Sequence, residues 1–215
     1  MQDNGSWVGP SAVWHTGGIR NEDWQEILFG DGFDVQPTGD GDVYAMYQGG
    51  AVNRINLTTL RSTEIQPVSP DSVPLRFAWN GALALDPQSQ DGLYFGSQRL
   101  HHSPDRGRTW STLSGDLTTN DPDKLQQATS GGLTIDATKA ENHCTILCIA
   151  PSAVRPDEIW VGTDDGRLQH TTDGGATWTD HGAKLKGLPE GSWIPQIHLS
   201  VHNPDEVYVV ANNYR

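Results

Sequence analysis

An eight-residue motif occurs twice in this chain, as SPDRGRTW at 103–110 and as TTDGGATW at 171–178. The copies agree at five positions with one fixed offset, so chance is a poor explanation for the match. Such an octet either performs chemistry or builds a repeated piece of scaffold, and its surroundings distinguish the two. The matched positions are Ser103 with Thr171, Asp105 with Asp173, Gly107 with Gly175, Thr109 with Thr177 and Trp110 with Trp178.

A short strand rich in apolar and aromatic residues recurs four times. It contains Tyr44, Tyr94, Trp160 and Tyr208, at spacings of 50, 66 and 48 residues. Each copy follows another short apolar strand and a turn rich in Pro or Asp. A third strand follows the first three copies, and in two of them the octet then leads into a fourth strand.

Four antiparallel strands repeated at this period predict an all-β fold, a β-propeller segment of about three to four four-stranded blades. We expect the blades at 33–65, 81–117, 145–182 and 196–215, the last of them incomplete. Closed propellers have about 4–8 blades. We therefore expect residues 1–215 to be part of a propeller in a longer protein, and we expect them to pack against the remaining blades of that propeller. One helix is expected at 118–128, as an excursion between blades.

The charge balance excludes several classes of partner. Lys+Arg 14 against Asp+Glu 27 gives a net charge of −13, which repels phosphate backbones and anionic lipid, so nucleic acid and membrane surfaces are not expected partners. No apolar run approaches the roughly 20 residues of a membrane-spanning helix. The N-terminal MQDNGSWVGP does not have the pattern of an export signal. No nucleotide-binding, serine-hydrolase or zinc-protease motif is present, and no cofactor is expected.

The two cysteines, Cys144 and Cys148, lie in HCTILCIA, which has the composition of a buried strand. Four residues apart on one strand they would be about 13 Å from each other, too far for a disulfide. His143 adjoins Cys144, which makes metal binding an alternative, but neighbouring side chains on a strand point to opposite faces. Packing is therefore favoured over ligation, and no metal site is expected.

The octet resembles the Asp-box, or BNR repeat, of sialidases, sortilin-type propellers and xyloglucan-degrading glycosidases. The resemblance implies a hairpin turn between the third and fourth strands of a blade. In that turn Asp105 and Asp173 would accept backbone N–H bonds, the glycine would take a positive φ, and the tryptophan would pack under the loop. Asp-boxes lie on the outer rim of propellers, so the resemblance favours scaffolding over catalysis.

Further segments resemble large bacterial propeller proteins labelled glycosyl hydrolase or sortilin-like. The similarity covers nearly the whole chain and implies a periplasmic or secreted location, although no defined reaction comes with it. The segments are DNGSWVGPS at 3–11, GDGFDV at 30–35, RFAWN at 76–80, SGDLT at 114–118, VGTDDG at 161–166 and the second octet.

Propellers bind ligands where loops join one blade to the next and second strands to third. Three of the expected inter-blade loops, at 21–32, 73–80 and 188–194, each carry a tryptophan. Trp24, Trp79 and Trp193 therefore predict an aromatic platform for a sugar or peptide, with burial between blades as the alternative. The polar candidates on the same face are Asp31, Asp34, Arg76, Arg99, Asp164 and Asp165. For the aspartates the alternative is that each caps a turn, and this alternative is favoured for Asp165, which forms an Asp-Gly pair.

Three functions are compatible with these residues. The preferred interpretation is a binding module that recognises a peptide or glycan without chemistry. A glycoside hydrolase needs two carboxylates across a cleft, and Asp31 or Asp34 facing Asp164 is the pair that the sequence offers. The third is a purely architectural role in a secreted assembly. A sialidase is not favoured, because the arginines are scattered.

Overall fold

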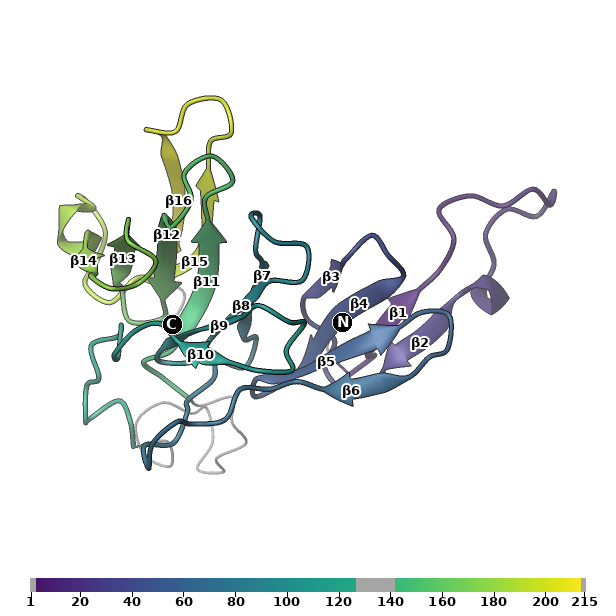
Figure 1. Cartoon of the computed structure of the whole chain (residues 1–215), viewed down its shortest axis with the longest axis horizontal. Helices are drawn as coiled ribbons and strands as arrows, with labels where there is room; N and C mark the ends of the chain where they lie inside the picture. The colour runs from purple at the N-terminus through teal and green to yellow at the C-terminus, as the bar shows by residue number, and fades with distance from the viewer. Residues whose placement is uncertain (1–2, 127–141, 214–215) are drawn as a thin grey trace.

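The computed structural model describes residues 3–126 and 142–213. In this part of the chain the strands form three four-stranded and two two-stranded antiparallel sheets (Figure 1). Two short 3-10 helices, η1 (Asn21–Asp23) and η2 (Gly182–Lys184), interrupt them. The strands are β1 (Ser6–Val8), β2 (Gln25–Leu28), β3 (Val35–Pro37), β4 (Asp42–Tyr47), β5 (Ala51–Asn56), β6 (Ser62–Glu64), β7 (Ala82–Leu85), β8 (Leu93–Gly96), β9 (Leu100–Ser103), β10 (Ser111–Thr112), β11 (Ile146–Pro151), β12 (Ile159–Thr163), β13 (Leu168–Thr171), β14 (Thr179–Asp180), β15 (Trp193–Leu199) and β16 (Val207–Asn212).

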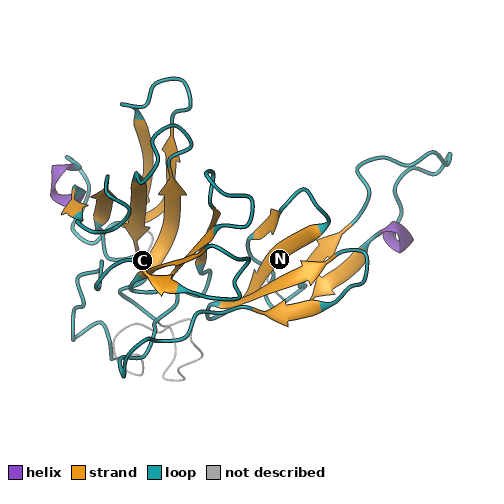
Figure 2. Cartoon of the chain, viewed as in Figure 1, coloured by secondary structure: helices purple, strands orange, loops and turns teal. Residues whose placement is uncertain are grey.

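Each four-stranded sheet is a meander in which consecutive strands are neighbours. Short turns between strands produce this order, because a tight turn can join only antiparallel neighbours. Tyr44, Tyr94, Trp160 and Tyr208 lie in β4, β8, β12 and β16, the second strands of their sheets. The sheets follow one another through the molecule in chain order (Figure 1), and Figure 2 shows that loops and turns join their strands. The predicted all-β propeller fold is confirmed.

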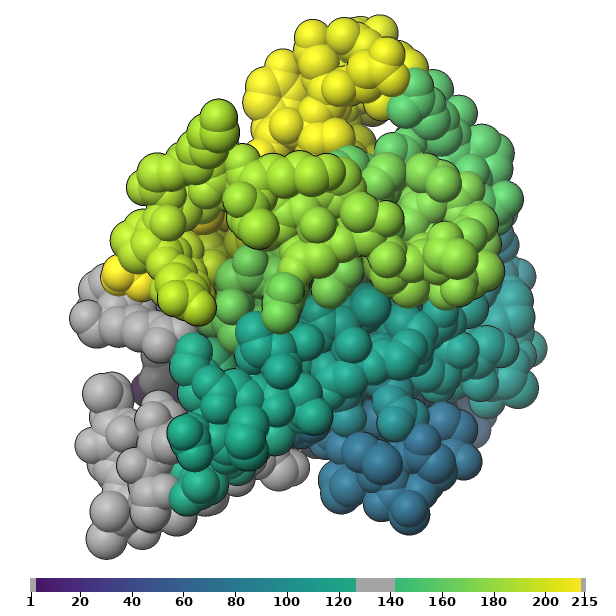
Figure 3. Space-filling model, turned by 90° about the vertical axis from the view of Figure 1, so that its left-hand side faces the viewer, coloured from purple at the N-terminus to yellow at the C-terminus, as the bar shows by residue number. Residues whose placement is uncertain are grey.

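Apolar side chains fill the spaces between successive sheets. Tyr44 and Met46 of β4 pack with Leu93 and Phe95 of β8, and all four are almost completely buried. Other clusters lie between the remaining neighbouring sheets, and Figure 3 shows the segments layered in the order of the chain. A blade has two faces to cover, so each depends on its neighbours for stability.

Both octets form the turn between the third and fourth strands of a sheet. Asp173 accepts hydrogen bonds from the hydroxyl of Thr177 (2.6 Å) and from its backbone N–H (2.9 Å). Asp105 does the same with Thr109, at 2.7 and 2.8 Å. The Thr177 bonds lower the pKa of Asp173 to about 2, and the Thr109 bonds lower the pKa of Asp105. Each carboxylate is thus occupied within its own turn.

The octet glycines determine how closely successive sheets approach. Gly107 has φ 79°, and a Cβ there would lie 2.6 Å from the side chain of Ile65, which follows β6. Gly175 has φ 99°, and a Cβ there would lie 2.7 Å from the carbonyl oxygen of Leu113, which follows β10. Any other residue at either position would strain the backbone and push the turn away from the preceding blade.

Other octet positions also support the scaffold. In the first octet the Ser103 hydroxyl accepts a hydrogen bond from the N–H of Gly107 (2.8 Å). The Trp110 indole donates to the carbonyl oxygen of Ile65 (2.8 Å), which lies just outside the preceding sheet. Trp178 of the second octet packs against the cluster between β7–β10 and β11–β14. The octet therefore holds its own blade against the preceding one.

The N-terminal part contains a sheet that the sequence did not predict. Residues 21–32 were expected to be a loop, but they contain η1 and β2, and β2 pairs with β1. Because β2 leads directly into β3, these two strands occupy the place of the third and fourth strands of a preceding blade. The alternation in residues 25–28 is too short to stand out as a strand.

The prediction of a helix at 118–128 is wrong for residues 118–126, which are the part of this range that the structure describes. Between 118 and 126 the chain makes only a turn at 122–125, where the Leu125 N–H donates to the carbonyl oxygen of Asp121 (3.1 Å). The Asp121 carboxylate does cap this turn, since it accepts the N–H of Asp123 (3.0 Å). A capping signal without an apolar face to bury does not sustain a helix. Residues 127 and 128 lie outside the described residues.

Replacing Asp173 by Ala is expected to lower the melting temperature, because the Thr177 N–H and hydroxyl lose their acceptor. A pKa lowered from 3.8 to about 2 stabilises the fold above the unfolded-state pKa, and this contribution disappears as the pH falls through 2. Thermal unfolding from about pH 2 to pH 7 measures the difference, with the exposed Asp123→Ala as control. Wild-type melting of Asp173→Ala at neutral pH would contradict the scaffold role.

Candidate functional site

The connections between sheets lie at the same end of the strands as the turns between second and third strands. In an antiparallel meander the fourth strand exits at the end where the second strand turns into the third. The described connections are 29–34, 65–81, 113–126 with 142–145, and 181–192, and the turns are 48–50, 97–99 and 164–167. We call this end of the molecule the loop face.

A cavity of about 310 Å³, named here the aromatic cavity, lies on the loop face. Trp79 comes from the connection before β7, Trp193 is the first residue of β15, and Asp164 follows β12. Residues far apart in the sequence thus meet because successive blades turn the same end of their strands toward one centre. The other lining residues are Ala78, Asn80, Asn142, Leu147 and Pro195.

Two predicted tryptophans contribute to this cavity in different ways. The Trp79 ring meets Phe33 edge to face, with centroids 6.5 Å apart, so neighbouring connections hold it in place. Trp193 is half-buried, and its indole Nε1 is buried without a hydrogen-bond partner among the described residues. An unpaired buried donor of this kind costs stability.

Trp24 does not share the site, contrary to expectation. It immediately precedes β2, as Trp110 precedes β10 and Trp178 precedes β14. The start of a fourth strand is the end opposite to the loop face. The Trp24 ring lies against the backbone of Gly9, where a Cβ would come 2.6 Å from the indole. Trp24 therefore occupies the position of the octet tryptophans.

Asp164 is the ionisable residue on the wall of the aromatic cavity. Its side chain accepts the N–H and the hydroxyl of Thr145, both at 2.9 Å, and the residue is only 3% exposed. Burial raises the pKa of Asp164 from 3.8 to about 7; the adjacent Asp165 adds to the rise and the Thr145 bonds oppose it. The cavity thus holds a carboxyl that changes charge near neutral pH.

Asp164 also has a scaffold role, as a comparison with the corresponding turns of the other sheets indicates. Gln48 follows β4 and accepts the backbone N–H of Asp31 (3.0 Å). Gln98 follows β8 by two residues and accepts the backbone N–H of Arg76 (2.8 Å). In each blade a polar side chain of this turn therefore anchors the connection from the preceding blade.

The other two acidic candidates lie apart from each other. Asp34 lines a cavity of about 450 Å³ along the first strands, named here the channel cavity, which shares three lining residues with the aromatic cavity. Its carboxylate accepts the N–H of Val35 (2.9 Å) and the amide of Gln36 (2.8 Å). Asp31 is buried and accepts the N–H of Asp3 (2.7 Å), so it is an anchor for the N-terminal segment.

Both predicted arginines form ion pairs with carboxylates of other loops. Arg76 pairs with Asp116 (2.7 Å) and donates to the carbonyl oxygen of Cys144 (3.3 Å). Arg99 pairs with Asp71 (2.8 Å). Neither guanidinium lines the aromatic cavity. These contacts hold the loops, and the ligand contact expected of both arginines stays a prediction.

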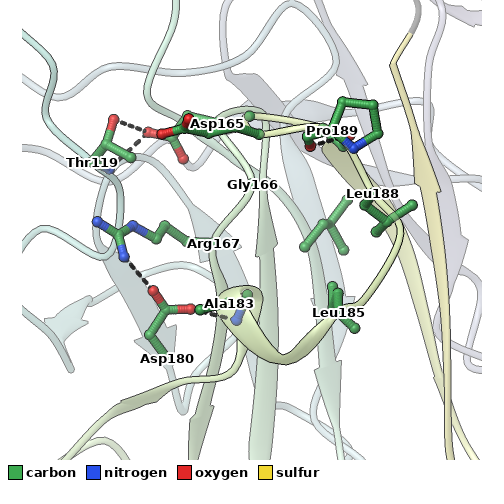
Figure 4. Close-up of a pocket in the computed structure, with 14 residues that line it drawn as sticks. Thr119, Asp165, Gly166, Arg167, Asp180, Ala183, Leu185, Leu188 and Pro189 are labelled. Carbon is green, nitrogen blue, oxygen red and sulfur yellow. Dashed lines mark hydrogen bonds and ion pairs between the residues drawn. The ribbon is translucent and has the colours of Figure 1, made fainter.

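Asp165 lines a different cavity, shown in Figure 4, of about 420 Å³ between the β12–β13 turn and residues 181–192. Its carboxylate accepts the N–H and hydroxyl of Thr119, both at 2.7 Å. Nearby, Arg167 pairs with Asp180. Asp165, Arg167 and Asp180 of this second cavity are therefore all engaged in contacts within the protein, as expected for anchored loops.

Three residues of the aromatic cavity were missed in the sequence. Leu147 and Pro195 belong to β11 and β15, and Asn142 lies shortly before β11, with its amide donating to the carbonyl oxygen of Phe77 (2.9 Å). A propeller places its first strands around the central axis, so residues at the starts of these strands were the available signal. The two thiols lie outside the aromatic cavity: Cys148 donates to the carbonyl oxygen of Ile194 (3.2 Å), and Cys144 precedes β11.

Comparison with known proteins supports the fold. No family model matches the sequence, and no curated protein matches it. YCF48 from Cyanidioschyzon merolae superposes with a TM-score of 0.51 at 13% identity, over 85% of this chain and 48% of its own. The extracellular domain of BT3049 from B. thetaiotaomicron gives 0.50 at 13% identity, over 83% of this chain and 22% of its own. A xyloglucanase from Xanthomonas campestris gives 0.42 at 15%, over 70% and 22%.

The structural neighbours are propeller proteins. This chain has the β-propeller fold. It spans about half of YCF48 and about a fifth of the BT3049 domain, and identities this low identify the fold alone. No helix among the described residues is long and apolar enough to span a membrane.

Replacing Asp164 by Asn is expected to flatten the pH dependence of stability. A carboxyl whose pKa rises from 3.8 to about 7 on folding contributes fully below the unfolded-state pKa and loses that contribution as the pH rises through 7. The free energy of unfolding of the wild type should therefore fall relative to that of Asp164→Asn. The fall is up to about 1.4 kcal/mol for each unit by which folding raises the pKa. Urea unfolding from about pH 4 to pH 8 tests this. Parallel curves for wild type and variant would exclude a raised pKa.

Proposed function

We propose that this chain is a propeller recognition module that binds a peptide or glycan on its loop face, in the aromatic cavity. The observation that carries the proposal is the convergence on one cavity of Trp79 from a connection, Asp164 from the β12–β13 turn and Trp193 from the start of β15. Its volume of about 310 Å³ is at the lower end of ligand pockets, which favours a single side chain or sugar ring as the inserted group.

We also propose that the octets are Asp-boxes and that the protein acts outside the cytoplasm, in the periplasm or secreted. Support for the first part is the use of Asp105 and Asp173 inside their own turns. The second part depends on the resemblance to sortilin-like bacterial propellers. Fractionation of the native host, with the protein detected by antibody, tests the location, and a cytoplasmic signal would contradict it.

Ligand binding should depend on the two tryptophans of the cavity and not on the third. Trp79→Ala and Trp193→Ala are each expected to weaken binding by about 1–3 kcal/mol, as for a buried aromatic anchor. Trp24→Ala is the matched control, since Trp24 lies at the opposite end of its strand. Peptide and glycan arrays identify a ligand, and tryptophan fluorescence titration of the folded variants measures its affinity. Equal losses for all three variants would contradict the proposed site.

A second candidate function is glycoside hydrolysis, and one observation favours it. Asp34 and Asp164 line adjoining cavities that share Asn80, Leu147 and Pro195, so two carboxyls flank one continuous region. A glycosidase needs such a pair. Reducing-end release from xyloglucan and related β-glucans tests it, and we expect no turnover. Turnover that Asp34→Asn or Asp164→Asn abolishes without unfolding would replace the binding proposal with the hydrolase.

A further inference from the structure

We propose that the aromatic cavity selects an organic ammonium group, presented as the lysine side chain of a peptide ligand. This inference rests on the proposed function and narrows its ligand from a peptide or glycan to a basic peptide. It follows from the charge of the cavity wall, from the aromatic groups on it and from the surroundings of Asp164.

The cavity wall carries one carboxyl group, that of Asp164, which becomes negative as the pH rises through about 7, and His143 is the basic group near it. Among the described residues that line it there is no lysine or arginine, and Asp164 is the one ionisable residue of that set. Two other titratable groups approach its carboxylate: Asp165 is next in the chain, and His143 Nδ1 lies 3.9 Å from Oδ1. A carboxylate in a poorly solvated wall attracts cations and rejects anions. An acidic peptide or uronic sugar is therefore disfavoured.

The two indoles supply the second part of the recognition. Trp79 and Trp193 line the same small cavity as Asp164. An ammonium group is attracted to the face of an indole, and the attraction is stronger where water is excluded. Ala78, Leu147 and Pro195 provide apolar wall that suits the methylene chain of a lysine. A neutral sugar could stack on the same rings, but it would not compensate the charge that Asp164 acquires above a pH of about 7.

The field of the whole chain acts in the same direction. With a net charge of −13 the protein concentrates cations near its surface and repels anionic ligands. A bound ammonium favours the ionised form of Asp164, whose pKa is about 7 without ligand. Affinity for a lysine peptide should therefore rise with pH across this range, and affinity for a neutral sugar should rise less.

Fluorescence titration with matched probes tests the inference. The probes are the capped tripeptides Ac-Gly-Lys-Gly-NH2, Ac-Gly-Gln-Gly-NH2 and Ac-Gly-Glu-Gly-NH2, with tetramethylammonium and cellotetraose as separate arms. We expect the lysine peptide to bind about tenfold more tightly than the glutamine peptide. Asp164→Asn should remove this preference, and Trp79→Leu should weaken lysine binding in case the first variant is unstable. Trp24→Ala is the control.

The outcomes separate the inference from the proposed function. Equal binding of the lysine and glutamine peptides overturns the inference and leaves peptide recognition standing. Binding of cellotetraose alone also overturns it and supports the glycan form of the function. Tetramethylammonium binding that exceeds lysine binding keeps the ammonium site and overturns its assignment to lysine. If none of the probes perturbs Trp79 or Trp193 fluorescence, both the inference and this cavity as the binding site are wrong.

Discussion

The arrangement of the molecule depends on a close contact between one blade and the turn of the next. Gly107 lies against Ile65, and Gly175 lies in the same way against Leu113. The contact requires both the absence of a Cβ and a positive φ, which glycine adopts without strain. The aspartate two residues earlier holds the turn in shape through its bonds to the following threonine. The octet thus fixes the spacing of the blades, and the apolar clusters fill the space that it leaves.

The aromatic cavity is a consequence of that spacing. Trp79 enters before the second full sheet, and Trp193 begins the sheet after the third, so two complete blades separate them in the chain. They meet because successive blades present the same end of their strands to the loop face. Anchors such as Gln98 and Asp164 tie each connection to the neighbouring turn. The loops that form the site are therefore held by the scaffold, which favours recognition by a preformed surface.

Aspartates perform different tasks in this protein because their surroundings differ. Asp173 lies in an exposed turn, where the Thr177 hydroxyl and N–H lower its pKa to about 2. Asp164 also accepts two hydrogen bonds, but burial dominates and raises its pKa to about 7. In the sequence Asp164 belongs to an Asp-Asp pair and Asp173 to an Asp-Gly pair, and both pairs are typical of turns. The difference between their pKa values appears only when the solvent exposure of each side chain is known. A functional role is better supported for the buried carboxyl, which lines a cavity, than for the patterned one.

The sequence by itself determined the strands of the four repeats and their antiparallel order, since these depend on local turns and on a repeated alternation of apolar residues, but it did not predict the sheet of β1 and β2. It placed Trp79, Trp193 and Asp164 among the candidates, but it gave equal standing to Trp24 and to the arginines. Only the tertiary structure decided between them. Trp24 precedes an unpredicted strand, β2, and therefore lies at the opposite end of the blade. Arg76 and Arg99 are occupied by carboxylates from distant loops. Which side chains meet at a centre, and which are withdrawn from water there, depends on the packing of blades, and a single blade's sequence does not contain that information.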